Sequence, residues 1–386
     1  MKILITGGTG LIGGAIAEAA VRKGHEVWIL SRKEPSGKIS GLDAHFICGD
    51  WYDDRFVEST VSQDYDVVVD TLIFNENQME RTIRIINGHC RQFLYISTDS
   101  VYPHPGKDVS ENDEIDINDI KWKYGYDKLK AERYLESHEQ ELSFFWTVIR
   151  PTVTFGDTRL PAGFVSKRNT YTLAERILNN KPVIRFDDPA TKHALCHVSV
   201  FGEAVSCLLM NEAAAGHCYH ISDNKSYTYD DIFRSIEKTL GTKGIYVHLP
   251  SDVLHRYNRV LYEDMIYDKV PEFTLDNSLI REICPDVEFS VDIDAVIAET
   301  LQNLKSTKSA VIQDQEYDVI SDLILLNEAD IISDTNMKNE VAAYTGRMTN
   351  EQKRTLKAYE SQNKRARFRE KMKKPLRSLK HKLIKG

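Results

Sequence analysis

The sequence predicts an α/β protein: a doubly wound parallel sheet, then a smaller C-terminal part, and finally a basic α-helical extension. Three observations support this fold class. The chain opens on a strand, a glycine turn and a helix; apolar strand-like runs then alternate with helical segments; and residues 351–386 are strongly basic. Nearly unbroken apolar strands are typical of a parallel sheet covered by helices on both faces. We expect one part over 1–150, a second over 151–305 with chain exchange between the two, and an extension over 306–386.

The first thirteen residues carry the strongest motif. Residues 1–5 (MKILI) form an apolar, β-favouring run, residues 6–13 read TGGTGLIG, and an alanine-rich helical segment follows. Gly7 permits the tight turn, Gly10 lets a pyrophosphate approach the backbone, and Gly13 lets the helix pack on the strand. The motif predicts a Rossmann-type dinucleotide-binding unit, with a purely structural glycine-rich turn as the alternative. The expected cofactor contacts are Gly7, Thr9, Gly10, Leu11, Ile12 and Gly13.

The end of the second strand bears on the choice of cofactor. The strand is expected at 26–30 and is followed by Ser31, Arg32 and Lys33. An acidic residue here would accept hydrogen bonds from the adenosine ribose and favour NAD, whereas a hydroxyl and two cations can receive the 2′-phosphate of NADP. We therefore expect NADP, with Ser31 and Arg32 as contacts. If the two cations are only solvated, NAD remains open.

Three more strands complete the expected sheet, at 44–48, 64–70 and 92–97. Ligands of such sheets bind at the carboxyl ends of the strands. Asp50, with Trp51 beside it, follows the third strand and is placed to meet the adenine amino group. Thr71 and Leu72 follow the fourth strand and should run beside the nicotinamide half of the cofactor.

The fifth strand leads to the candidate catalytic residues. Thr98 lies at its carboxyl end, and Tyr124 and Lys128 lie further along in a predicted helix, on one face and one turn apart. A nearby ammonium favours the phenolate, so we expect the pKa of Tyr124 to be lowered toward working pH. Thr98 would hydrogen-bond the same substrate oxygen. Taken alone, a Tyr-x-x-x-Lys spacing is more often a solvated helix face, but its order after the glycine turn and Thr98 favours catalysis.

Several motifs occur in an order that marks a family. Beside TGGTGLIG, the chain contains YISTDSVY at 95–102, YGYDKLKAE at 124–132, IRPTVTFG at 149–156 and HVSVFGEAV at 197–205. Over about residues 1–305 the sequence resembles an extended short-chain dehydrogenase/reductase of the NAD-dependent epimerase/dehydratase family. Most members of that family act on nucleotide-activated sugars.

The resemblance implies a function as well as a fold. Thr98, Tyr124 and Lys128 would be the catalytic set, with Lys128 also holding the nicotinamide ribose, while Pro151 and Thr152 would lie near the nicotinamide. The implied enzyme is NAD(P)-dependent and reduces a keto-sugar or epimerises a nucleotide sugar for polysaccharide or glycoconjugate synthesis. The NADP-like end of the second strand favours reduction, because an epimerase returns its hydride and usually retains NAD.

Two departures from the family leave alternatives open. Asp99 follows Thr98, as in the sugar 4,6-dehydratases, but Ser100 stands where those enzymes have a second carboxylate, and eliminating water needs both a base and an acid. A dehydratase is therefore one alternative, and Asp99 is equally well a loop carboxylate. Residues 70–75 (DTLIFN) are closer to a branch that includes chloroplast stem-loop-binding relatives. The other alternative is a non-catalytic RNA- or partner-binding protein.

Composition predicts an ordinary soluble protein. Of its 386 residues, 41% are hydrophobic and 28% are charged. No signal peptide precedes the first strand and no apolar run approaches the roughly 18 residues of a membrane span, so we expect a cytoplasmic location. The six cysteines are scattered without metal-ligand spacing, so we expect reduced thiols and no metal.

The extension is expected to be helical. Tyr317–Asn327 is apolar enough to pack on the main body, whereas residues 351–386 carry 14 Lys/Arg and three Asp/Glu. A basic amphipathic helix of this kind can lie on an anionic membrane, here at the inner face, or on an acidic partner. A solvated helix stays open, and nucleic acid is least favoured because few aromatics accompany the cations. The family resemblance also admits a homodimer.

Overall fold

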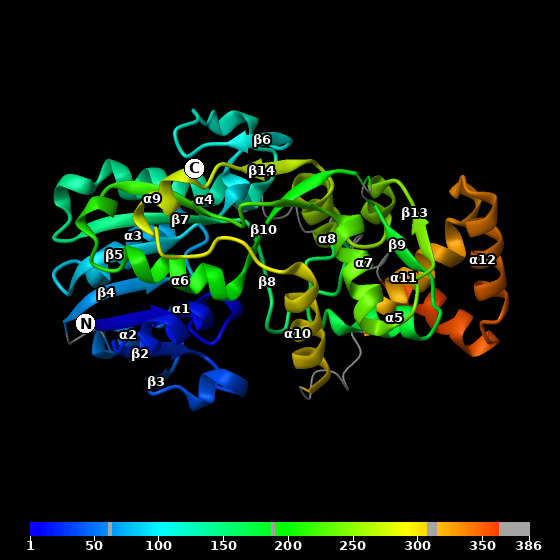
Figure 1. The fold of residues 1–386 in the computed structure, drawn as a ribbon, viewed down its shortest axis with the longest axis horizontal. Coiled ribbons are helices and arrows are strands. Elements are labelled where there is room, and N and C mark those ends of the chain that lie inside the picture. Colours follow the sequence, from blue (N-terminus) through cyan, green and yellow to red (C-terminus); the bar gives the residue numbers. More distant parts are fainter. Residues whose placement is uncertain (61–63, 187, 189, 307–314, 363–386) are drawn as a thin grey trace, which may run out of the picture.

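The computed structural model describes residues 1–60, 64–186, 188, 190–306 and 315–362. Its N-terminal half is a layered α/β unit, and the C-terminal extension lies at the opposite end of the molecule (Figure 1). The elements of the N-terminal half are β1 (Lys2–Thr6), α1 (Leu11–Arg22), β2 (Glu26–Ser31), β3 (His45–Cys48), α2 (Asp54–Thr60), β4 (Tyr65–Asp70), α3 (Glu76–Ile86), β5 (Cys90–Ile96), η2 (Asp99–Val101), β6 (Gly106–Val109), α4 (Lys123–Ser137) and β7 (Phe145–Pro151).

The central sheet has seven strands in the order β11-β7-β5-β4-β1-β2-β3, where β11 is His217–Ile221. Every neighbouring pair is parallel. The strands expected at 1–5, 26–30, 44–48, 64–70 and 92–97 are all present, shifted by one or two residues at most of their ends. The predicted fold class is therefore confirmed. The strand order reverses beside β1, where the crevice for a ligand opens in sheets of this type.

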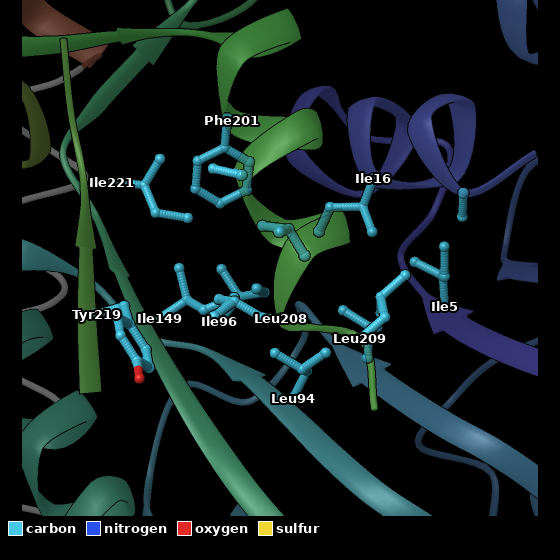
Figure 2. Close-up of a cluster of buried hydrophobic side chains, with 14 of the residues drawn as sticks. Ile5, Ile16, Leu94, Ile96, Ile149, Phe201, Leu208, Leu209, Tyr219 and Ile221 are labelled. Atoms are coloured by element: carbon cyan, nitrogen blue, oxygen red, sulfur yellow. The ribbon is translucent and has the colours of Figure 1, made fainter. Parts of the chain in front are cut away.

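One face of the sheet is covered by α1 and α6 (Val198–Leu208), which pack tightly on each other. A Cβ at Gly202 would lie 2.4 Å from the Ala15 carbonyl oxygen, so only glycine allows the two helices to approach so closely. Ile5, Ile16 and Phe201 meet in the core between this helix layer and the sheet (Figure 2). Because α6 belongs to the second half of the chain, this core joins the two halves.

The second half contains short strands and more helices, which are β8 (Val153–Phe155), α5 (Tyr171–Leu178), β9 (Val183–Arg185), β10 (Lys192–His197), β12 (Ser226–Thr228), α7 (Tyr229–Leu240), β13 (Tyr246–His248), α8 (Arg259–Asp264), η7 (Met265–Lys269), β14 (Phe273–Leu275), α9 (Ser278–Ile283) and α10 (Ile293–Ser306). Its larger sheet has the order β12-β10-β14-β6, with β8 beside β10. The two halves exchange strands, since β11 joins the first sheet and β6 joins the second.

The extension begins with α11 (Gln315–Asn327), as the sequence predicts, and continues through α12 (Thr335–Gly346) into a helix over 350–362. Ile320, Leu323 and Ile324 of α11 share a hydrophobic core with Ile184 and Val247 of the two-stranded sheet β13-β9. Most of the basic tail, residues 363–386, lies outside the described residues, so its expected surface contacts stay a prediction. Within the part of the chain that is described, no helix has the length and hydrophobicity of a membrane span.

Candidate active site

The glycine turn between β1 and α1 forms an open cradle. Gly7 has φ +70°, and a Cβ there would lie 2.3 Å from Thr71 Oγ1; a Cβ at Gly13 would lie 2.6 Å from the Gly7 carbonyl oxygen. Gly10 is the residue before α1, and no side chain within the described residues caps that helix start. The first amides of α1 therefore carry the partial positive charge of a helix N-terminus, which fits the pyrophosphate of a dinucleotide.

The groups expected around the adenosine half lie at the carboxyl ends of β2 and β3. Ser31 ends β2, and its Oγ lies 2.6 Å from Thr9 Oγ1 in the glycine turn. Arg32 is exposed beside it. Asp50 is also exposed, and one of its carboxylate oxygens accepts a hydrogen bond of 3.0 Å from the Tyr52 amide. Hydroxyl, cation and carboxylate are thus all accessible from the cradle side of the sheet.

The structure corrects the prediction for Trp51. Its ring is 1% exposed and packs in the core beneath the sheet, in one cluster with Leu4 and Met79. The prediction that Trp51 contacts the cofactor is wrong for the side chain, because an indole next to an apolar sheet face is stabilised by burial. Thr71 and Leu72, by contrast, lie directly against Gly7, and Thr71 Oγ1 donates a hydrogen bond of 2.8 Å to the Thr6 carbonyl.

The candidate catalytic residues come together where α4 crosses the loop after β5. A Cβ at Gly125 would lie 1.9 Å from the Ser100 carbonyl oxygen, so glycine is what lets the helix approach this loop. Thr98 Oγ1 lies 3.1 Å from Ser100 Oγ, and the Thr98 side chain is close enough to the Tyr124 phenol to lower the pKa of that phenol. Lys128 Nζ is fully buried and donates to the carbonyls of Ile73 and Ile96, at 2.6 and 2.8 Å. Three groups that are distant in sequence thus form one site.

The prediction that Lys128 lowers the pKa of Tyr124 is wrong. Burial, together with the charges of the nearby Asp99 and Asp268, raises the pKa of Tyr124 to about 12 and outweighs the Thr98 hydroxyl, which lowers it. Burial also lowers the pKa of Lys128 to about 7, against the attraction of Asp70. The ammonium is directed at two carbonyls rather than at the phenol, so the local charges hold Tyr124 as a neutral proton donor.

Asp99 lies in the same buried group, beside Tyr124. Burial raises the pKa of Asp99 to about 7, and the charge of Asp268 from η7 acts in the same direction. Burial disfavours ionised Asp268 as well, but Lys269 pairs with it and holds the pKa of Asp268 below its usual value. Asp99 is therefore a carboxyl group able to exchange a proton near neutral pH, and more than a solvated loop carboxylate.

Pro151 and Thr152 lie at the carboxyl end of β7, next to this group. Pro151 is the last residue of the strand and is buried. Thr152 Oγ1 donates a hydrogen bond of 2.8 Å to the Ala194 carbonyl. Its hydroxyl also lies close enough to Asp99 to lower the pKa of that carboxyl, against the larger effect of burial.

A buried ion pair anchors α4, the helix that carries Tyr124 and Lys128, to the sheet. Glu132, one turn after Lys128 on α4, accepts a hydrogen bond of 2.6 Å from Arg150 Nη2 of β7. Arg150 Nη1 also donates to the Tyr102 hydroxyl at 2.6 Å, and that hydroxyl lies 2.7 Å from His220 Nε2 of β11. This chain of contacts joins α4 to two strands and so fixes the height of Tyr124 and Lys128 above the sheet.

A cavity of about 290 Å³ opens between the glycine turn and the second half of the chain. Leu11 of α1 lines one side, and the segment 158–170 lines much of the other. Four cations line it, Arg159, Lys167, Arg168 and Lys269, of which Lys167 pairs with Asp264 and Lys269 with Asp268. Such a cavity suits a ligand with several negative charges, such as a diphosphate. A second hollow, of about 450 Å³, lies between the outer faces of α3 and α4, away from all these groups.

Sequence reasoning did not find these four cations or Asp268. The cluster Ser166-Lys167-Arg168 after Pro161 and Gly163 is a visible basic loop, and it could have been proposed as an anion contact. Asp268 and Lys269 carry no such signal, because nothing in the sequence indicates that η7 lies near Asp99.

Comparisons with known proteins agree with this fold. The UDP-glucuronic acid 4-epimerase of Bacillus cereus, solved with UDP-glucuronic acid and NAD, is 18% identical with a TM-score of 0.62, covering 79% of this chain and 99% of that one. The dTDP-glucose 4,6-dehydratase of Bacillus anthracis, solved with NAD, is 17% identical with a TM-score of 0.61, covering 80% and 98%. At these identities the likeness establishes the fold.

A curated relative lies closer in sequence. The chloroplast stem-loop binding protein of 41 kDa b from Arabidopsis thaliana is 28% identical over 256 residues, which are 62% of this chain. The chain spans 63% of the length of that relative. The model of the NAD dependent epimerase/dehydratase family matches residues 3–222, more than half of the chain, and the protein therefore belongs to that family, as its sequence predicts.

Proposed function

We propose that the protein is an NAD(P)-dependent oxidoreductase or epimerase that acts on a nucleotide-activated sugar. The observation that carries the proposal is the position of Tyr124. Its phenol lies beside Thr98 and Asp99, while Leu11 at the uncapped start of α1 and four cations line the adjoining cavity. A dinucleotide on the α1 amides and a diphosphate-bearing sugar in the cavity would meet at this phenol.

The chain's own residues supply proton chemistry and orientation. A bound nicotinamide would accept or supply the hydride. Tyr124, neutral because its pKa is near 12, donates its proton to a sugar oxygen as that oxygen gains negative charge, and Thr98 holds the same oxygen by a hydrogen bond. Lys128 is held on two backbone carbonyls, in line with the role at the nicotinamide ribose that the family implies. In epimerisation Tyr124 would exchange the proton in both directions.

We further propose a preference for NADP and for reduction. Ser31 and the exposed Arg32 stand at the end of β2, where an acidic residue would favour NAD. Calorimetric titration with NADP(H) and NAD(H) tests this directly. Tighter binding of NADP(H) is expected, and a preference for NAD(H) would replace the reductase by an epimerase that recycles its cofactor.

The test of the main proposal combines this titration with a panel of nucleotide sugars and the variant Tyr124→Phe. Turnover of one nucleotide sugar should be lost in the variant, while cofactor affinity stays at the wild-type value, because the substitution removes only the phenolic hydroxyl. Unchanged turnover would remove Tyr124 from the mechanism. If neither cofactor binds the wild type, the chain is better described as a non-catalytic binding protein, and stem-loop RNA becomes the next ligand to test.

Dehydration is the second candidate, and the closeness of Asp268 to Asp99, whose pKa it raises, favours it. Elimination of water beside a sugar ketone needs a base that removes the α-proton and an acid that protonates the leaving hydroxyl. Asp99, with a pKa of about 7, can serve as the acid, and Asp268 stands in for the carboxylate that Ser100 replaces. Mass spectrometry of the product would decide between the two reactions. A product lighter by one water, whose formation both Asp99→Asn and Asp268→Asn abolish, supports dehydration. A product with the mass of the substrate excludes it.

We propose a cytoplasmic location, with the basic tail over 351–386 resting on an anionic membrane surface or an acidic protein partner. Its charge supports this, since each cation near an anionic headgroup contributes on the order of 1 kcal/mol. Sedimentation with anionic liposomes should carry down the full chain but not a chain ending at 350. If both remain in the supernatant, the membrane contact is excluded.

A further inference from the structure

The cationic cavity depends on one loop. Residues 158–170 contribute most of its lining, including Arg159, Lys167 and Arg168, and α5 follows this loop directly. Ordering a loop costs conformational entropy, so contacts outside the loop are needed to hold one conformation. One such contact is the ion pair of Lys167 with Asp264 of α8, at 2.5 Å. Two more come from the C-terminal extension.

The first contact is at the middle of the loop. The Tyr317 hydroxyl of α11 donates a hydrogen bond of 3.2 Å to the Phe164 carbonyl, and the two rings pack with centroids 5.1 Å apart. Phe164 in turn packs edge-on against Phe186, at 4.9 Å. Tyr317 and Phe164 are 2% and 3% exposed, so this contact is shielded from water. The neighbours of Phe164 on both sides, Gly163 and Val165, line the cavity.

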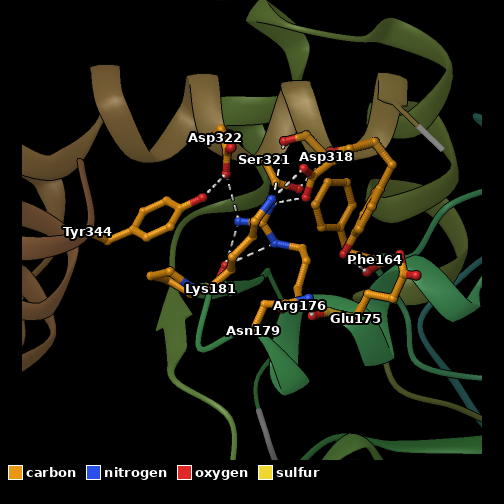
Figure 3. Close-up of polar contacts among 11 residues, drawn as sticks. Phe164, Glu175, Arg176, Asn179, Lys181, Asp318, Ser321, Asp322 and Tyr344 are labelled. Atoms are coloured by element: carbon orange, nitrogen blue, oxygen red, sulfur yellow. Dashed lines mark hydrogen bonds and ion pairs between the residues drawn. The ribbon is translucent and has the colours of Figure 1, made fainter. Parts of the chain in front are cut away.

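The second contact is at α5, one turn after the loop ends. The Arg176 guanidinium is 1% exposed and is paired with Asp318 and, at 2.9 Å, with Asp322, both on α11 (Figure 3). It also donates a hydrogen bond of 2.8 Å to the Pro182 carbonyl. A buried guanidinium with two carboxylates has few alternative positions, because any movement would leave a charge unpaired away from water. Helix α11 therefore holds α5 in a fixed position.

We propose that the C-terminal extension positions the substrate loop, with Tyr317 as the positioning residue through which α11 sets the conformation of residues 158–170. This rests on the proposed function, since the ligand of the cavity is taken to be the nucleotide diphosphate of the substrate. The solved structures that the chain resembles match about four fifths of it, although they are themselves covered almost completely.

The test is the variant Tyr317→Phe, which removes one hydroxyl and keeps the ring packing. With UDP as the probe, calorimetry should show affinity lowered by about 5-fold, the effect expected of one hydrogen bond, while affinity for NAD(P)(H) is unchanged. Hydrogen exchange of the backbone amides in 158–170 should be faster than in the wild type. With an accepted nucleotide sugar, KM should rise and kcat should change little.

The matched control is Tyr257→Phe. Tyr257 is also buried and its hydroxyl also bridges to the extension, but that hydroxyl donates its bond of 2.6 Å to Glu328 rather than to the loop. This variant should keep the wild-type UDP affinity and amide exchange in 158–170. Equal effects of the two variants, or none in Tyr317→Phe, would overturn the proposal. If the wild type does not bind UDP, the proposed substrate fails, yet amide exchange in the loop still tests the positioning role by itself.

Discussion

Lys128 shows how burial changes what a residue can do. Its ammonium lies on two backbone carbonyls and is attracted by Asp70 and Glu132, yet burial still lowers the pKa to about 7. In the unfolded chain the pKa would be near 10.5. Between these two values the unfolded state binds one more proton than the folded state, so the free energy of unfolding rises with pH.

The variant Lys128→Met tests this at the residue scale. From pH 7 to pH 9 the free energy of unfolding of the wild type should rise relative to that of the variant, by at most about 1.4 kcal/mol per pH unit. Urea denaturation at several pH values, without cofactor, measures the free energy of unfolding of both proteins. Parallel curves for the two proteins would mean that Lys128 keeps an ordinary pKa in the folded state.

At the scale of elements, α4 is held over the sheet by the buried pair of Glu132 and Arg150. Both side chains are almost inaccessible, so Arg150→Met would leave the Glu132 carboxylate unpaired in the interior. We expect the free energy of unfolding to fall by about 3–5 kcal/mol, and turnover to fall with it as Tyr124 moves. Chemical denaturation and activity on the same preparation measure the two effects.

The control for this pair is an exposed one. Lys238 pairs with Asp294 between α7 and α10, with 71% and 41% of the side chains exposed. Lys238→Ala should leave stability nearly unchanged, because both charges remain in water when separated. If Lys238→Ala and Arg150→Met lower the free energy of unfolding by similar amounts, burial is not what makes the inner pair important.

At the scale of the whole molecule, the two halves are expected to unfold together. Strand β11 and helix α6 come from the second half yet complete the first sheet and its core, and β6 from the first half joins the second sheet. All four tryptophans lie before residue 150. Tryptophan fluorescence therefore reports on the first half, whereas far-ultraviolet circular dichroism reports on helices in both. The two thermal transitions should coincide, and separate midpoints would show that the halves unfold independently.

The sequence by itself determined the fold class, the strands of the first half and the family. These follow from local signals: apolar runs of strand length, a glycine-rich turn between a strand and a helix, and short motifs in a fixed order. The same signals predicted that Thr98, Tyr124 and Lys128 share a site, because the carboxyl end of β5 and the start of α4 lie at the same edge of a parallel sheet. They also predicted the helix at Tyr317–Asn327.

Only the tertiary structure decided the electrostatics of that site and its outer wall. The pKa of Tyr124 is raised because burial and two carboxylates outweigh Thr98, and one of those carboxylates, Asp268, comes from a distant turn. Trp51 turned inward because the apolar face beneath it had room for an indole. The loop over 158–170 is held by α11 through Phe164 and Arg176. Desolvation and long-range contacts depend on which segments meet in space, and no local pattern in the sequence records that.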